Sequence, residues 1–149
     1  MHLGRLAAYL RMLGFDTRYD NQAGDAELAD IASAEQRILL TRDRGLLMRS
    51  AVTRGYWLRH TGGRRQTAEI VGRFDLARSF RPFTRCMACN AVLQAVAKQD
   101  AERLVPARAA VSHTEFQCCP NCGRVYWKGS HYRRMQNWIE ELTRLPDRG

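Results

Sequence analysis

The sequence predicts an α/β fold, in which a parallel sheet is flanked by helices and is followed by a small cysteine-rich unit. Helical patterns alternate with short apolar runs in the first half of the chain, as in parallel sheets covered by helices. Two C-x-x-C pairs replace this alternation after "RSFRPFTRC". We therefore expect an N-terminal α/β domain over residues 1–83, a cysteine-rich domain over 84–135, and a C-terminal helix and tail over 131–149.

The first predicted element is a helix, although a parallel α/β domain normally begins with a strand. In "HLGRLAAYLRMLGF" the apolar residues recur at helical spacing, and Gly14 is a suitable C-cap. The next five residues, "DTRYD" at 16–20, are compatible with a short strand. A second helix is expected from Asp25, because acidic side chains in a first turn favour the helix N-terminus.

Further apolar runs and helical patterns complete the predicted order. "RILLT" is predicted to be a buried strand, since it is short, continuous and apolar. The other expected elements are a short helix from Gly45 to about Val52, a strand in "GYWLRH", a helix over 66–74, and a last helix in "HYRRMQNWIEELTRL".

The charge of the chain favours a polyanionic partner. There are 24 Lys and Arg residues against 15 Asp and Glu residues, a formal net charge of +9. Because basic side chains that meet phosphates release counterions, this balance favours nucleic acid, although a basic surface can also serve only solubility. Arg5 and Arg11 interrupt the first apolar run, so neither a signal peptide nor a membrane span is expected. We expect a cytoplasmic protein with no membrane partner.

The cysteines predict a structural zinc site. Cys86 and Cys89 form one C-x-x-C pair, and Cys119 and Cys122 form the other. Two such turns complete a closed tetrahedral site, which is typical of a zinc ribbon. The alternatives are disulfides, which are rare in the cytosol, and a redox pair, which needs only one C-x-x-C. Cys118 adjoins Cys119, but only Cys119 has the C-x-x-C spacing to Cys122.

Two aspartates are candidate ligands for Mg²⁺ or Mn²⁺. Asp43 follows a predicted buried strand, and ligands of open α/β sheets bind at the carboxyl ends of the strands. Asp25 begins the helix that leads into that strand, so the two carboxylates could meet at one sheet edge and hold a hard cation. Arg42 and Arg44 would then neutralise a phosphate. An equally open interpretation is that Asp25 and Asp43 are helix N-caps.

A further candidate RNA contact lies in "YWKGSHYRRM". Here aromatic residues interleave with Lys128 and His131, a pattern that can stack a base and contact a phosphate. The alternative is structural, in which Tyr126 and Trp127 pack the ribbon against the main domain and His131 caps a turn.

These residues together resemble the Mut-seven-C ribonuclease family, a PIN-like domain fused to a zinc ribbon. The blocks "HLGRLAAYLRMLGFDT", "DAELADIA", "RILLTRDRGLL", "RCMACN" and "CPNCGRVYWKGSHYRRM" occur in the family's order and span residues 2–135. The resemblance implies a PIN-like parallel sheet flanked by helices, metal-dependent cleavage of RNA, and a C-terminal zinc ribbon. It implies that Asp25 and Asp43 are the catalytic acids that bind Mg²⁺ or Mn²⁺.

One departure from the family pattern concerns the start of the chain. Family members carry a strand ending in an aspartate just before the position of His2, where this sequence has only Met1. We therefore expect that this form is less stable than an extended one and cleaves RNA weakly or not at all, and that its start is internal or misassigned. Alternatively, a protein partner or a dimer mate supplies the strand.

The sequence thus leads to three hypotheses of function. In the first, the protein is a metal-dependent ribonuclease, with Asp25 and Asp43 at the metal and Arg5, Arg42 and Arg44 at the RNA phosphates. In the second, it is a non-catalytic RNA-binding zinc-ribbon module. In the third, it is a toxin-like or ribosome-associated protein whose ribbon docks another protein.

Overall fold

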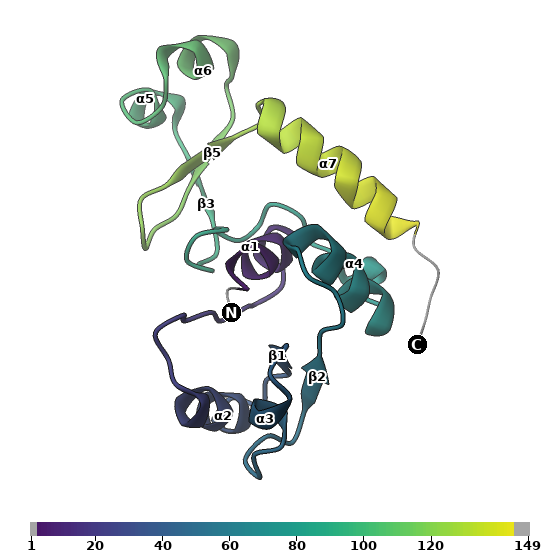
Figure 1. The fold of residues 1–149 in the computed structure, drawn as a ribbon. Coiled ribbons are helices and arrows are strands. Elements are labelled where there is room, and N and C mark those ends of the chain that lie inside the picture. The colour runs from purple at the N-terminus through teal and green to yellow at the C-terminus, as the bar shows by residue number, and fades with distance from the viewer. Residues whose placement is uncertain (1–2, 145–149) are drawn as a thin grey trace.

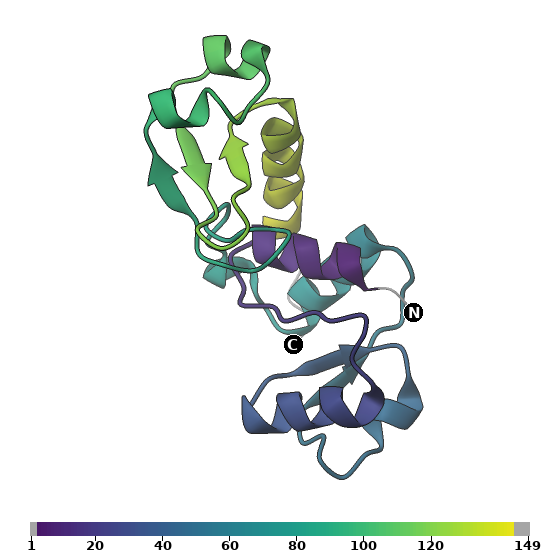
Figure 2. The same ribbon diagram turned by 90° about the vertical axis from the view of Figure 1, so that its left-hand side faces the viewer.

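The computed structural model describes residues 3–144, which form three regions stacked along one direction (Figures 1 and 2). A small parallel sheet with two helices lies at one end, helices α1 and α4 lie in the middle, and an antiparallel sheet with helix α7 lies at the other end. The elements in chain order are α1 (Gly4–Met12), α2 (Asp25–Ala34), β1 (Leu39–Thr41), α3 (Arg44–Leu47), β2 (Gly55–Trp57), α4 (Gly63–Arg73), a 3₁₀ turn η1 (Ala77–Ser79), β3 (Gln94–Val96), α5 (Lys98–Ala101), α6 (Ala107–Ser112), β4 (Phe116–Cys118), β5 (Val125–Trp127) and α7 (Ser130–Thr143).

The N-terminal half confirms the predicted α/β class and the predicted helix start. The first helix ends at Met12, and Gly14 follows in the left-handed region with φ 100°. Strands β1 and β2 pair in parallel, with Leu39 opposite Gly55 and Thr41 opposite Trp57. Between residues 3 and 144 this is the whole parallel sheet, since the other sheet is antiparallel. The parallel sheet among the described residues thus has two strands, and the larger PIN-like sheet stays a prediction.

The expected strand over residues 16–20 does not form. This segment is a loop, and its polar groups bond to the cysteine-rich half of the chain instead of to another strand. The N–H of Thr17 donates to Oδ1 of Asn90 at 2.9 Å, and Nδ2 of Asn90 donates to Oδ1 of Asp16 at 2.6 Å. The backbone N–H of Thr17 is thus satisfied by a side chain 73 positions away.

The core consists of two clusters on opposite sides of α1. One lies between α1, α4 and α7 and includes Met12, Leu13 and Trp138. The ring of Tyr9 meets that of Trp138 edge to face, with centroids 4.7 Å apart. The other cluster joins α1 to β2 and α4 through Leu6, Leu58 and other apolar residues. Helix α7 therefore returns from the ribbon to cover the first helix (Figure 1).

Arg11 joins α1 to the first pair of cysteines. Its side chain is 7% exposed, so its donors must find partners within the protein. Nε donates to the carbonyl oxygen of Thr17 at 2.9 Å, and Nη1 donates to those of Met87 and Ala88, each at 3.1 Å. One buried guanidinium thus fixes the turn between Cys86 and Cys89 to the N-terminal half. The predicted boundary at residue 84 remains a prediction.

The antiparallel sheet has the order β3-β4-β5. Helices α5 and α6 lie between β3 and β4, so residues 98–112 form a helical insertion in the hairpin, at the end farthest from α1 (Figure 1).

Within residues 3–144 no helix is both long enough and apolar enough to cross a membrane.

Candidate metal centre and nucleic-acid interface

The four predicted cysteines converge in one cluster. The Sγ atoms of Cys86, Cys89, Cys119 and Cys122 all lie within 4.8 Å of one another. Cys86 and Cys122 have a sulfur–sulfur distance of 3.6 Å, and Cys89 and Cys119 have one of 3.2 Å. Between residues 3 and 144, no other group of three or more His, Cys, Asp or Glu side chains converges in this way.

The two cysteine turns have the same backbone geometry. The N–H of Asn90 donates to the carbonyl oxygen of Cys86 at 2.8 Å, and that of Gly123 donates to the carbonyl oxygen of Cys119 at 2.9 Å. Asn90 and Gly123 both have positive φ, 75° and 80° respectively. Because each turn presents two sulfurs on one side, the pair of turns makes a tetrahedral set of thiols.

This geometry fits zinc. A tetrahedral site with Zn–S distances of about 2.3 Å places its sulfurs roughly 3.8 Å apart, close to the separations of 3.2 and 3.6 Å found here. The N–H of Ala91 and the side chain of Asn121 lower the pKa of Cys89, which favours the thiolate, whereas burial raises the pKa of Cys119. The four close cysteines could therefore hold a metal such as zinc, with no position left open for substrate.

Tyr126 and Cys118 lie next to the cysteine cluster but are not among its four thiols. The hydroxyl oxygen of Tyr126 lies 3.1 Å from Sγ of Cys86, and burial together with that cysteine raises the pKa of Tyr126. Cys118 ends β4 and is not part of the cluster. Its neighbour Cys119 is, because adjacent side chains on an extended backbone point in opposite directions.

Asp43 is the N-cap of α3. Its Oδ1 accepts hydrogen bonds from the N–H groups of Gly45 at 2.9 Å and Leu46 at 3.2 Å. Its own N–H donates to Oγ1 of Thr41, the last residue of β1, at 3.0 Å. These bonds fix the carboxylate at the carboxyl end of the strand. They occupy Oδ1 only, and Oδ2 has no hydrogen-bond partner within residues 3–144.

Asp25 is exposed at the start of α2, and it is not a cap. The N-cap of this helix is Gly24, without a side-chain hydrogen bond, so the capping interpretation of Asp25 is wrong. Asp25 and Asp43 line the same large cleft, of about 1310 Å³. Asp16 and Asp20 line it as well, but within residues 3–144 none of these acids belongs to a converging group of three or more metal-ligand side chains.

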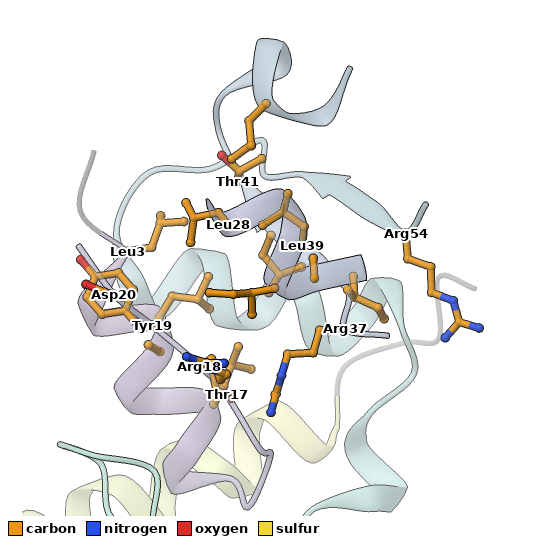
Figure 3. A pocket seen from close by; sticks show the side chains of 18 of the residues that line it. Leu3, Thr17, Arg18, Tyr19, Asp20, Leu28, Arg37, Leu39, Thr41 and Arg54 are labelled. Atoms are coloured by element: carbon orange, nitrogen blue, oxygen red, sulfur yellow. The ribbon is translucent and has the colours of Figure 1, made fainter. Parts of the chain in front are cut away.

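The cleft separates α1 and α4 from α2 and β1, and its interior is apolar. Figure 3 shows side chains from both sides of it, with Leu3, Leu28 and Leu39 toward the interior and Arg54 pointing outward at one end. Its walls include part of the second core cluster, such as Leu6, Leu10 and Ile70. Strand β1 pairs with β2 on one side only within the described residues. The cleft therefore lies directly against the second core cluster, although Leu6, Leu10 and Ile70 themselves are at most 5% exposed.

Arg42 and Arg44 flank Asp43 but have different surroundings. Nη1 of Arg42 donates to three consecutive carbonyl oxygens, those of Leu58 (2.9 Å), Arg59 (2.8 Å) and His60 (3.3 Å). This guanidinium holds the segment after β2, which limits its use as a phosphate clamp. Arg44 is exposed, and its Cζ lies 4.2 Å from the ring centre of Trp57.

The remaining predicted contacts lie in other places. Arg5 is exposed on α1 and lines a second cavity, not the cleft with Asp43. Lys128 is on the ribbon, where its Nζ is 3.2 Å from a carboxylate oxygen of Glu115. His131 is exposed in the first turn of α7. The structure therefore does not gather Arg5, Lys128 and His131 around Asp43.

Two residues at the carboxyl end of β2 were not expected from the sequence. Trp57 donates from Nε1 to the carbonyl oxygen of Arg42 at 3.1 Å, which ties the two strand ends together. Glu69, from α4, accepts from the Tyr56 hydroxyl at 2.5 Å and from the N–H groups of Arg59 and His60. Burial opposes its ionisation, but these donors lower the pKa of Glu69 to about 2. An aromatic residue next to basic ones in "GYWLRH" was the only sequence signal.

Comparison with known proteins identifies one family. The model of the Mut7-C RNAse domain matches residues 1–139. No curated protein and no solved structure matches the chain.

Proposed function

Because this chain belongs to the Mut7-C RNAse domain family, we propose that it is a metal-dependent ribonuclease that hydrolyses RNA phosphodiester bonds at the carboxyl end of β1. Family membership by itself indicates ribonuclease activity in a general sense and RNA as the substrate. The observation that carries the finer proposal is that Asp25 and Asp43 line one cleft there.

The two aspartates have the roles of metal ligands in this proposal. Asp43 is held by its cap bonds to Gly45 and Leu46, so its second carboxylate oxygen has a fixed direction. Asp25 is exposed at the start of α2 and lines the same cleft. Carboxylate oxygens suit Mg²⁺ and Mn²⁺, and such an ion, when bound, activates water and stabilises a displaced phosphate oxygen. The aspartates would position that ion beside the phosphodiester.

Basic residues would hold the RNA backbone near the aspartates. Arg44 is exposed beside Trp57. Arg42 is close to Arg44 in the chain and adds a second positive charge to this edge. Arg5 would act from α1, and Lys128 and His131 would contact RNA from the ribbon. Phosphate contacts of this kind give binding without sequence preference.

We also infer the wider framework of this site. The parallel pairing of β1 and β2, with an acid directly after β1, supports a PIN-like sheet in the N-terminal half. The cysteine cluster supports a structural zinc ribbon. A protein partner or a dimer mate that adds a strand beside β1 is compatible with the apolar cleft. The cytoplasm is the compartment we expect.

Asp43→Asn tests the proposal without disturbing the fold, because asparagine is also a good N-cap. The zinc-loaded protein would be incubated with single-stranded and structured RNA, with Mn²⁺ and without added Mg²⁺ or Mn²⁺. We expect Mn²⁺-dependent cleavage that Asp43→Asn and Asp25→Asn abolish, while Asp30→Asn, an exposed acid on α2, has no effect. Cleavage that survives Asp43→Asn, or that does not depend on added metal, would contradict the metal-acid mechanism.

A second function is favoured by one observation. Within residues 3–144 neither Asp25 nor Asp43 belongs to a converging group of three or more acidic, His or Cys side chains, whereas a complete carboxylate site gathers several such ligands. A non-catalytic RNA-binding module with a zinc ribbon fits this arrangement. Tight RNA binding without cleavage in any metal would support it.

A further inference from the structure

A second cavity, of about 420 Å³, lies between the start of α1 and the start of α4. Its walls come from two elements far apart in the sequence. They are Arg5 and Tyr9 of α1, and residues 61–65, which include Arg64 and Arg65. No acidic residue lines it.

The three arginines of this cavity lack acidic partners. Arg5, Arg64 and Arg65 are exposed, and none forms an ion pair with a carboxylate within residues 3–144. Elsewhere on the N-terminal half, Arg18 and Arg37 do pair with acids. Three positively charged guanidinium groups close together repel one another when no carboxylate lies nearby. An anion that enters the cavity is attracted by all three charges.

The cavity walls are held in place by close helix packing. A Cβ atom at Gly63 would lie 2.6 Å from Cβ of Arg5 and 3.1 Å from the Tyr9 ring, so only glycine permits this approach. Cζ of Arg64 lies 4.7 Å from the ring centre of Trp138, which orients its side chain. The backbone that carries Arg5 and the side chain of Arg64 are therefore positioned by contacts with other elements.

The cavity lies along the same edge of the sheet as Asp43. Residues 58–62 leave the carboxyl end of β2 and lead directly into it. Arg42, next to Asp43, holds the first part of this segment through the carbonyl oxygens of residues 58–60. A polyanionic strand that passes Asp43 and continues along this edge would reach the three arginines.

We propose that the cavity formed by Arg5, Arg64 and Arg65 binds a phosphate group of the RNA strand that crosses the Asp43 edge. This inference rests on the proposed function, because the strand is taken to be its substrate. The phosphate belongs either to an internal phosphodiester or to a 5′-terminal monophosphate. Arginine suits both, since its planar fork donates two hydrogen bonds to one phosphate. The cavity would then fix the position of the strand relative to Asp43.

Binding can be measured separately from cleavage in the zinc-loaded Asp43→Asn protein with no Mg²⁺ or Mn²⁺ added. The RNA is one oligonucleotide prepared with a 5′-phosphate and with a 5′-hydroxyl. We compare Arg5→Gln and Arg65→Gln, singly and together, with Arg108→Gln on the distant helix α6 as the control. The double variant is expected to bind about tenfold more weakly and to lower the slope of log K against log salt by roughly two contacts. Melting curves of each variant exclude loss of fold.

The two forms of RNA identify the source of the phosphate. An equal loss for both identifies an internal phosphodiester, and a loss confined to the 5′-phosphorylated form identifies a terminal phosphate. Both outcomes support the cavity. A double variant that binds like Arg108→Gln would overturn it, even if wild-type protein cleaves RNA. Absence of cleavage by wild-type protein, with binding that depends on these arginines, would instead contradict the proposed function and leave the cavity in place.

Discussion

The cysteine cluster and the acidic edge of the parallel sheet are both sites of candidate metal ligands, yet their geometry has different origins. Each cysteine pair is fixed by a turn of a few residues, and the two turns repeat the same hydrogen bonds. Asp25 and Asp43 belong to separate elements on the sides of a cleft of about 1310 Å³. The geometry of the cysteine cluster depends mainly on its two short turns. The arrangement of Asp25 and Asp43 depends instead on how the elements of the parallel sheet pack together.

The two regions also differ in how many neighbouring strands β4 and β1 have. In the ribbon, β4 has neighbours on both sides. In the N-terminal half, β1 has one neighbour within the described residues, and Ile38 just before it is 45% exposed. We therefore expect perturbations of the ribbon to have large and clear effects. Perturbations of the acidic edge should act mainly on RNA and less on stability.

The largest effect is expected from breaking the cysteine cluster. Cys122 is the exposed member, so Cys122→Ser removes a ligand with little loss of packing. We expect wild-type protein to bind about one zinc ion per chain. The variant should lose most of this zinc and melt more than ~10 °C lower, because the binding free energy of structural zinc is also folding free energy. Zinc stoichiometry and melting curves measure both.

Cys118→Ser is the matched control for this prediction. Cys118 adjoins Cys119 but lies outside the cluster, so its substitution should leave zinc content and melting temperature nearly unchanged. Full zinc content in Cys122→Ser would show that the assignment of the four ligands is wrong.

The next largest effect is expected where the two regions meet. Arg11→Met keeps the length of the buried stem but removes the donors to Thr17, Met87 and Ala88. Three partly buried hydrogen bonds would be lost, at a cost of roughly 2 to 4 kcal/mol in the free energy of unfolding. Denaturant unfolding of the zinc-loaded protein measures this.

The control for Arg11→Met is the substitution Arg18→Met. Arg18 pairs with Glu35 at the surface, where its side chain is 49% exposed, so the expected cost is below ~1 kcal/mol. Equal effects of the two substitutions would mean that Arg11 does not join the N-terminal half to the first cysteine turn.

A smaller effect, with a defined pH dependence, is expected at Glu69. Its pKa falls from an ordinary value of 4.5 to about 2 in the folded protein. The stabilisation is therefore fully present above pH ~4.5 and is lost as the pH falls toward ~2. Glu69→Gln should cost roughly 2 to 3 kcal/mol at pH 7, and the difference from wild type should shrink below pH ~4.5.

Unfolding at pH 7, 4 and 3 measures this dependence, with Glu140→Gln as the control. Glu140 is exposed on α7, so its substitution should shift stability little at any of the three pH values. A cost of Glu69→Gln that stays constant down to pH 3 would contradict the assigned hydrogen bonds.

The sequence predicted those parts of the molecule that depend on local patterns. The spacing of the cysteines identified the cluster, and the apolar periodicity placed α1, α2, α4 and α7 to within a few residues. Gly14 was identified as a helix end because a left-handed φ there requires glycine. These features are encoded within one or two turns of chain, so a single sequence suffices to find them.

The parts that the sequence did not predict depend on contacts between distant elements. Residues 16–20 have the composition of a strand, but Asn90 takes up their backbone donor. Arg42 has the position of a phosphate ligand, yet its guanidinium binds carbonyl oxygens of the segment after β2. Capping was an open interpretation of both aspartates, and only the final backbone makes Asp43 a cap and Asp25 not one. No pattern of a few residues contains this information.

The smallest predicted effect compares one basic residue from each region in RNA binding. Arg44→Gln removes an exposed guanidinium beside Asp43, and Lys128→Gln removes an ammonium group on the ribbon that already lies 3.2 Å from a carboxylate oxygen of Glu115. We expect Arg44→Gln to weaken binding a few-fold and to lower the salt slope by about one contact. Lys128→Gln should change the slope less, because Glu115 already neutralises part of its charge. Fluorescence titrations of the zinc-loaded protein over a range of salt, without added Mg²⁺ or Mn²⁺ to prevent cleavage, measure both slopes. The reverse order would place the main RNA contact on the ribbon, and it would favour the RNA-binding module over a ribonuclease whose substrate crosses the end of β1.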